Sequence, residues 1–103
     1  NVLRTITEKD KIREDVKRAM KIIQEKKIDI TKGYANWFKI GCALAHEFGE
    51  EMREWFHIIS YFHEDYYHSD CDIQYNKCLN YNEESGVKIA TFFYYCKKYG
   101  IRY

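Results

Sequence analysis

Residues 33–49 read GYANWFKIGCALAHEFG, and this stretch decides the fold of the 103-residue chain. Its large apolar residues return every three or four positions, the spacing that places side chains on one face of an α-helix. The residues on that face are Tyr34, Trp37, Gly41, Leu44 and Phe48. A glycine inside a helix costs about 1 kcal/mol relative to alanine. Gly41 therefore predicts that another element packs closely against this helix.

The rest of the chain has the same helical character. Thr7 is the expected N-cap of a first helix, Ser69 is the expected N-cap of a fourth, and Gly49 and Gly100 are expected helix stops. No proline interrupts the apolar patterns. We therefore predict an all-α fold, a compact bundle of about five helices in a single domain. The expected helices span residues 7–27, 33–48, 50–62, 70–81 and 90–99.

Composition is typical of a globular domain with one modest core, since 46% of residues are hydrophobic and 17% are aromatic. The net charge of +1 is unevenly distributed. Residues 34–75 carry eight acidic and two basic side chains, whereas residues 76–103 carry five basic and two acidic ones. A basic face formed by the chain ends could hold phosphates. Ordinary solvated helix surfaces are the alternative explanation.

Four cysteines, Cys42, Cys71, Cys78 and Cys96, form no C-x-x-C pair. They are expected to be buried thiols in a reducing compartment rather than a disulfide framework. No apolar run reaches the length of about 18 residues that a membrane span needs, and no secretory leader pattern is present. A cytoplasmic location follows as the expectation. The missing initiating methionine suggests a piece of a longer protein.

Two chemical alternatives deserve consideration in the segment after the third helix. His63, His68 and Cys71 lie close together in the sequence, beside several aspartates, and could be zinc ligands. Their spacing lacks a usual ligand pair, and a polar loop that enters a helix explains it more simply. A Cys71–His63 catalytic pair is less favoured still. No Gly-rich phosphate loop is present. We therefore expect no catalytic residue, no metal and no cofactor.

A nucleic-acid interface is one functional hypothesis for the basic residues, although ordinary helix packing and capping explain each of them equally simply. Basic side chains can hold phosphates, and aromatic side chains between them can stack on bases. The aromatic candidates are Tyr95, Tyr99 and Tyr103. The alternative is that the lysines near position 97 only stabilise a helix C-terminus. The basic candidates are Lys88, Lys97, Lys98, Arg102, Lys39 and Lys77.

Three motifs together resemble a known family. They are Y-x-x-W-x-x-I-G-x-A-L at residues 34–44, G-x-x-x-R-x-W-F at residues 49–56, and V-x-I-A-T-F-F-x-x-C-K-K-x-G at residues 87–100. This order resembles the primase C-terminal domain of the second type (PriCT type 2) over about residues 31–101. By this resemblance, residues 31–103 form the primase C-terminal-like domain. Residues 1–30 then form an N-terminal helix that serves as a linker or extension.

The resemblance implies a non-catalytic accessory domain of a multidomain DNA replication protein, a primase or primase-helicase of bacteria, phages or mobile elements. Such a domain assists in positioning template and primer or the nucleotide, and the catalytic acidic triad belongs to a neighbouring domain. The implied partners are single-stranded DNA or primer-template and the neighbouring primase-polymerase or helicase domain, with no membrane. The alternative function is a protein-docking module with no nucleic-acid contact, whose acidic middle segment faces a basic partner.

Overall fold

The computed structural model, which describes residues 7–81 and 86–103, is 74% helical and has no strand within those residues. The all-α fold and the expectation of about five helices are confirmed. A 3₁₀ turn, η2, connects α2 directly to α3. The elements are α1 (Glu8–Lys26), α2 (Tyr34–Phe48), η2 (Gly49–Met52), α3 (Arg53–Ser60), α4 (His68–Asn80) and α5 (Ile89–Lys98).

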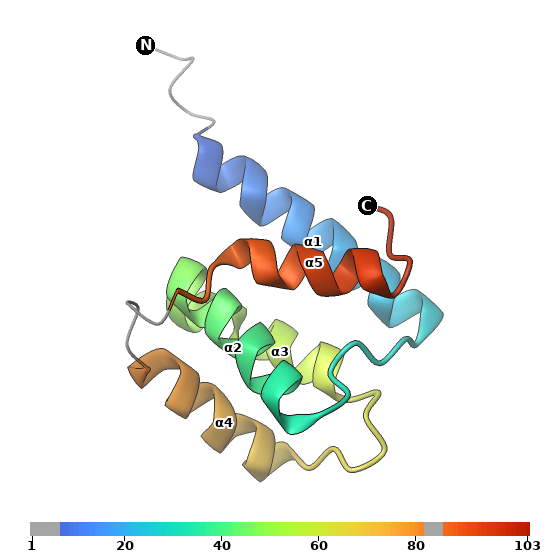
Figure 1. Cartoon of the computed structure of the whole chain (residues 1–103), viewed down its shortest axis with the longest axis vertical. Helices are drawn as coiled ribbons and strands as arrows, with labels where there is room; N and C mark the ends of the chain where they lie inside the picture. Colours follow the sequence, from blue (N-terminus) through green and yellow to red (C-terminus); the bar gives the residue numbers. More distant parts are fainter. Residues whose placement is uncertain (1–6, 82–85) are drawn as a thin grey trace.

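Helix α2 is the centre of the bundle. Figure 1 shows α5 crossing α2 on one side and α4 running along its other side. Helix α3 contacts α2, α4 and α1, so α1 joins the bundle mainly through α3. The helix that the sequence identifies as decisive is therefore the one on which the other helices assemble.

Gly41 lies at the closest approach between helices. A β-carbon added at this position would lie 2.6 Å from Sγ of Cys78 on α4 and 3.1 Å from the ring of Phe56 on α3. Carbon and sulfur atoms in ordinary contact are farther apart, so even alanine does not fit without a shift of its neighbours. The predicted close packing at Gly41 is confirmed, and its partners are α3 and α4.

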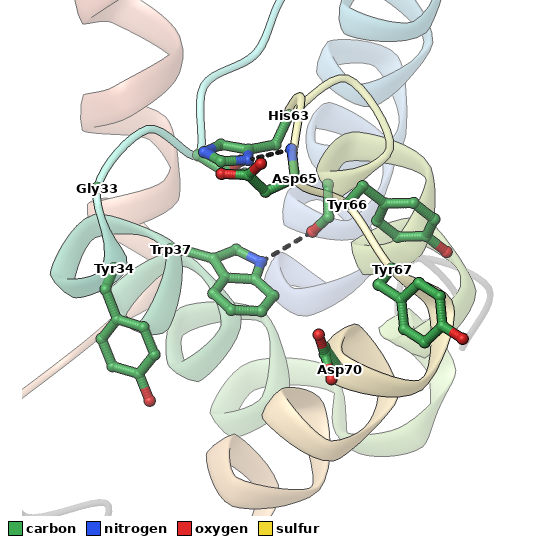
Figure 2. A pocket seen from close by; sticks show the side chains of 10 residues that line it. Gly33, Tyr34, Trp37, His63, Asp65, Tyr66, Tyr67 and Asp70 are labelled. Carbon is green, nitrogen blue, oxygen red and sulfur yellow. Dashed lines mark hydrogen bonds between the residues drawn. The ribbon is translucent and has the colours of Figure 1, made fainter.

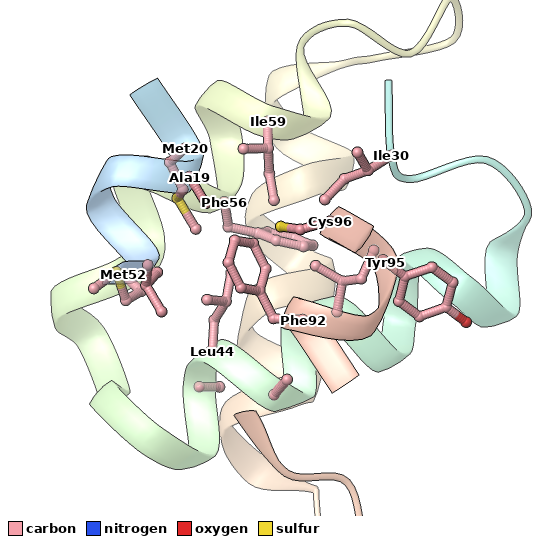
Figure 3. Close-up of a cluster of buried hydrophobic side chains, with 14 of the residues drawn as sticks. Ala19, Met20, Ile30, Leu44, Met52, Phe56, Ile59, Phe92, Tyr95 and Cys96 are labelled. Carbon is pink, nitrogen blue, oxygen red and sulfur yellow. The ribbon is translucent and has the colours of Figure 1, made fainter. Parts of the chain in front are cut away.

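The apolar core lies between α1, α2, α3 and α5 (Figure 3), and α4 adds Tyr75 and two buried cysteines to it. Tyr75, Phe56 and Phe92 are the largest fully buried side chains of the described residues. Helix α1 belongs to this core, because four of its side chains are buried there. They are Val16, Ala19, Met20 and Ile23. The division of the chain at residue 30 stays a prediction about domain organisation.

The start of α1 follows the sequence prediction. The Asp10 amide donates to Oγ1 of Thr7 at 3.1 Å, and the Thr7 amide donates to Oδ2 of Asp10 at 3.3 Å. This reciprocal pair is a capping box, which satisfies backbone donors that the first helical turn leaves free. Thr7 is therefore confirmed as the N-cap.

The boundaries of α3 and α4 differ from the prediction. The residues after Gly49 first form the 3₁₀ turn, and α3 then ends at Ser60, where the His63 amide donates back to the Ser60 carbonyl at 3.0 Å. Helix α4 begins at His68, because the backbone at Tyr67 is extended and its carbonyl accepts from the Cys71 amide. The prediction that Ser69 caps this helix is wrong, since Ser69 already lies in the first turn.

All four cysteines are free and buried, which confirms the prediction of buried thiols. Burial raises the pKa of Cys71 to about 11 and that of Cys96 to about 12, so both remain neutral thiols near neutral pH. Among the helices of the described residues, none is both long and apolar enough to span a membrane.

Candidate functional site

The C-terminal end of α5 carries the densest group of the predicted basic residues. Lys97 and Lys98 are exposed in its last turn, and Arg102 is exposed a few residues later. Tyr94 lies one turn before Lys98, so both side chains share one helical face. The Tyr94 side chain is 61% exposed. The end of α5 therefore presents an exposed aromatic ring on the same helical face as Lys98, with the exposed Lys97 and Arg102 close by in the sequence.

One of the three aromatic candidates is buried, whereas Tyr99 is half-buried and Tyr103 is exposed. Tyr95 is only 6% exposed, and its hydroxyl donates to Oδ1 of Asn36 on α2 at 2.5 Å. Tyr95 is therefore a packing residue, and the hypothesis that it stacks on bases is wrong. Tyr94 was overlooked, although its spacing from Phe92 and Cys96 places it on the face opposite the core.

The other three basic candidates lie apart from this group. Lys88 precedes the first turn of α5, so the length of the helix, about 15 Å, separates it from Lys97. Lys39 is exposed on α2, and Lys77 is exposed on α4, one turn before Tyr81. The ring of Tyr81 contacts that of Phe38, the residue before Lys39. The six cations therefore do not all belong to one patch, since Lys88 and Lys97 lie at opposite ends of α5.

A polar network joins α3 to α4 on the acidic side of the bundle. The guanidinium of Arg53 donates twice to Glu50, at 2.7 and 2.8 Å, and it also donates to Oδ1 of Asp72 at 2.9 Å. Hydrogen bonds from His57 and Arg53 lower the pKa of Asp72, so its carboxylate stays ionised near neutral pH. Arg53 is therefore a structural link between the two helices.

The same network contains an arrangement that resembles a catalytic triad. His57 lies between the Tyr66 hydroxyl, 2.9 Å from Nδ1, and Oδ1 of Asp72, 3.1 Å from Nε2. A nucleophilic tyrosine needs a lowered pKa. The pKa of Tyr66 is instead raised, chiefly by burial and further by nearby anionic groups. The geometry thus favours a neutral phenol that holds the loop in place.

The three candidate metal ligands make contacts with different residues and do not converge on one point. Nδ1 of His63 accepts from the Asp65 amide at 3.1 Å, and His68 stacks on His57 with ring centroids 4.4 Å apart. Cys71 is buried on α4, where its thiol is near Ser60. Within the described residues, no group of three or more His, Cys, Asp or Glu side chains is placed to hold a metal ion.

A cavity of about 220 Å³ lies where the start of α2, the end of α3 and the start of α4 meet (Figure 2). Its walls are mainly aromatic, and two carboxylates, Asp65 and Asp70, face it. Tyr34 at its edge is 63% exposed, so the shared aromatic face of α2 is not covered at its first residue. The lining residues are Thr31, Gly33, Tyr34, Trp37, Ser60, His63, Asp65, Tyr66, Tyr67 and Asp70.

Trp37 is the most firmly held side chain of this cavity. Its indole stacks on Phe56 with an interplanar angle of 10°, and the ring of Tyr34 meets it edge-on. Its Nε1 donates to Oγ of the buried Ser60 at 3.0 Å (Figure 2). These contacts fix the orientation of the ring, so the cavity has one rigid wall before anything binds.

A second, more open cavity of about 530 Å³ lies on the other side of Tyr66. It is bounded by Arg53, His57 and Asp72 of the polar network and by Tyr61 and Phe62 at the end of α3. Tyr66 lines both cavities.

Comparison with known proteins identifies one family. The family model described as primase C terminal 2 (PriCT-2) matches residues 16–96. The match begins within α1 and ends in α5, so it includes every helix of the bundle. No curated protein and no solved structure matches the chain.

Proposed function

The chain belongs to the primase C-terminal 2 family, and from this premise we propose that it positions template or primer strand for a catalytic domain. A domain of this family is an accessory domain of a primase and is not itself catalytic. Positioning a strand requires contacts with its backbone and bases rather than reactive groups. A strand-holding surface is therefore the function to test first.

One observation supports the proposal most directly, namely the exposed group at the end of α5. Lys97, Lys98 and Arg102 can neutralise phosphates, and the exposed ring of Tyr94 can stack on a base. This combination of cations and an exposed aromatic ring is typical of proteins that hold single strands without sequence preference. Lys39, Lys77 and Lys88 would extend the path of the strand along the molecule.

The biological setting is part of the same proposal. The domain would work in the cytoplasm beside a primase-polymerase or helicase-like domain of a bacterial, phage or mobile-element replication protein. Its substrate would be single-stranded DNA or a primer-template, and its contact with the initiating nucleotide would be indirect, through the strand it holds. Binding by the isolated domain should be weak, because the parent protein supplies the remaining contacts.

The test is a fluorescence-anisotropy titration of a labelled single-stranded oligonucleotide at two salt concentrations. We expect binding that weakens steeply with salt. Changing Lys97, Lys98 and Arg102 to Gln should weaken it and lower the slope of log K against log salt by about 0.7 for each lost phosphate contact. Tyr94→Ala should weaken binding at both salt concentrations, because stacking does not release counterions.

The matched control removes the same charge from another surface. Lys11, Lys21 and Lys26 are exposed on α1, and changing them to Gln should leave most of the binding intact. A further variant with Lys39, Lys77 and Lys88 changed to Gln measures how far the strand extends. Equal losses in the α1 control and the α5 variant would contradict a specific interface. The absence of binding at low salt would favour the docking alternative.

A further inference from the structure

We propose that the 220 Å³ cavity is a docking site for an arginine side chain carried by a basic segment of a partner protein. The site is formed by Asp65, Asp70 and the indole of Trp37. It lies between α2 and α4, whereas the strand-holding group lies on α5. This proposal does not depend on DNA binding, and either one can fail without the other.

The two carboxylates of the cavity favour a positively charged guest. Asp65 and Asp70 lie at opposite ends of the aromatic slot in Figure 2, and the lining contains no lysine or arginine. Among the described residues, neither carboxylate takes part in an ion pair. Lys32 is the nearest basic residue in the sequence, but it is exposed and does not line the cavity. The two carboxylates are therefore available to a positively charged guest.

The aromatic wall favours a flat cation. Phe56 stacks on the Trp37 indole, and the indole also lines the cavity, where a guest can meet it. A guanidinium group stacks on an aromatic ring and donates hydrogen bonds to a carboxylate in the same plane, which a compact ammonium group cannot do equally well. Ser60 and Tyr34 already hold the Trp37 ring in place. Binding therefore loses little conformational entropy at this side chain.

The size of the cavity fits one side chain rather than a whole ligand. Pockets for drug-sized molecules measure about 300–1,000 Å³, and this cavity is smaller. Two exposed tyrosines, Tyr34 and Tyr67, stand at its edge, and Tyr61 is exposed nearby. A central pocket with an aromatic rim is the usual arrangement of a binding hot spot between proteins.

A nucleotide is the competing occupant. A base could stack on Trp37 and donate amino protons to an aspartate. Its phosphates would then lie near Asp65, Asp70 and the neighbouring Glu64, and no lysine or arginine in the lining would compensate for the repulsion. The charges thus favour arginine over a nucleotide.

The test uses nuclear magnetic resonance of the ¹⁵N-labelled chain, titrated with the peptide acetyl-Gly-Gly-Arg-Gly-Gly-amide. The indole N–H signal of Trp37 should shift together with amides that line the cavity, while that of Trp55, which does not line the cavity, serves as an internal reference. The same peptide with citrulline, a neutral isostere of arginine, should cause no comparable shift. A lysine peptide should bind more weakly than the arginine peptide.

Variants separate the site from general charge attraction. Asp65 and Asp70 are exposed, so the double change Asp65→Asn and Asp70→Asn should leave the spectrum of the folded state recognisable. It should weaken arginine binding by about tenfold or more. The control Glu14→Gln and Glu25→Gln removes the same charge from exposed positions of α1 and should retain binding.

Three results would overturn the proposal. One is equal binding of the arginine and citrulline peptides, and another is equal loss of binding in the Asp65/Asp70 and Glu14/Glu25 variants. The third is a deoxycytidine monophosphate titration that shifts the Trp37 signal when the arginine peptide does not, because the cavity would then be a base-binding site.

Discussion

The two halves of α2 have different surroundings, although they belong to one continuous helix. Residues 40–45 in the second half are all buried, and Gly41 there admits no extra atom. In the first half, Tyr34 is mostly exposed, and Trp37 combines a packed face with a position beside a cavity. The closed half thus determines how helices assemble, and the open half leaves room for a guest. Four substitutions test this contrast.

Phe56→Ala should have the largest effect, because this ring lies under both halves of α2. It contacts Trp37 on one side and borders Gly41 on the other. Removing a fully buried phenylalanine costs about 3–5 kcal/mol of the free energy of unfolding. Urea denaturation measures this loss. Tyr94→Ala, at an exposed position, serves as the control. If both variants lost equally little unfolding free energy, packing against Phe56 would not stabilise the two halves of α2.

Gly41→Ala should destabilise the closed half by a smaller amount. Overpacking of a core costs about 1–3 kcal/mol, and it should outweigh the gain of about 1 kcal/mol from better helix propensity. Because the nearest atom is Sγ of Cys78, the same change should cost less in a Cys78→Ala background. Stabilisation by Gly41→Ala would show that α3 and α4 can move away from α2 at little cost.

Tyr34→Phe should test the open half with a smaller change in packing than Phe56→Ala or Gly41→Ala. It removes only the hydroxyl, which donates to Oε1 of Gln74 at 3.2 Å and links α2 to α4. The expected loss is about 0.5–1.5 kcal/mol, again measured by urea denaturation. A loss comparable with that of Phe56→Ala would contradict the distinction between the halves.

Asp72→Asn should have the smallest effect on packing and a distinct dependence on pH. The hydrogen bonds from His57 and Arg53 hold the folded-state pKa of Asp72 below its unfolded value. The stability it contributes is therefore present above the unfolded pKa, near 3.9, and is lost as pH falls through the folded pKa. The variant should be less stable than the parent chain at neutral pH and lose less stability in acid.

The remaining acid dependence of that variant has known sources. Hydrogen bonds also lower the pKa of Asp10, from Thr7 and Arg13, and of Glu50, from Arg53. Unfolding free energies measured from neutral pH into acid should therefore retain some slope in Asp72→Asn. A slope identical to that of the parent chain would show that Asp72 makes no pH-dependent contribution.

Sequence periodicity predicted the closed half of α2 well and its open half poorly. Gly41 and the Thr7 capping box are local sequence signals. A glycine inside a helix indicates close packing, and a threonine before a helix indicates an N-cap. Tyr34 shows the limit, because periodicity defines a helical face but not how far the neighbouring helix covers it.

The two candidate sites depend on sequence information to different degrees. The exposed stripe of α5 can be derived from the sequence, once Phe92 and Cys96 are taken as the buried side. The cavity could not be predicted in this way, because its lining comes from residues 31–37, 60–67 and 70, which an irregular loop brings together. The direction of that loop depends on the bond between Tyr66 and His57, a contact across nine residues without a sequence motif.

Tyr66 has one further consequence, because its ring belongs to the lining of both cavities. Its hydroxyl lies 2.9 Å from Nδ1 of His57, which holds the ring in place. A guest that displaced this ring in one cavity would therefore also change the lining of the other. The two cavities thus share one structural element, and a substitution at Tyr66 alters both at once.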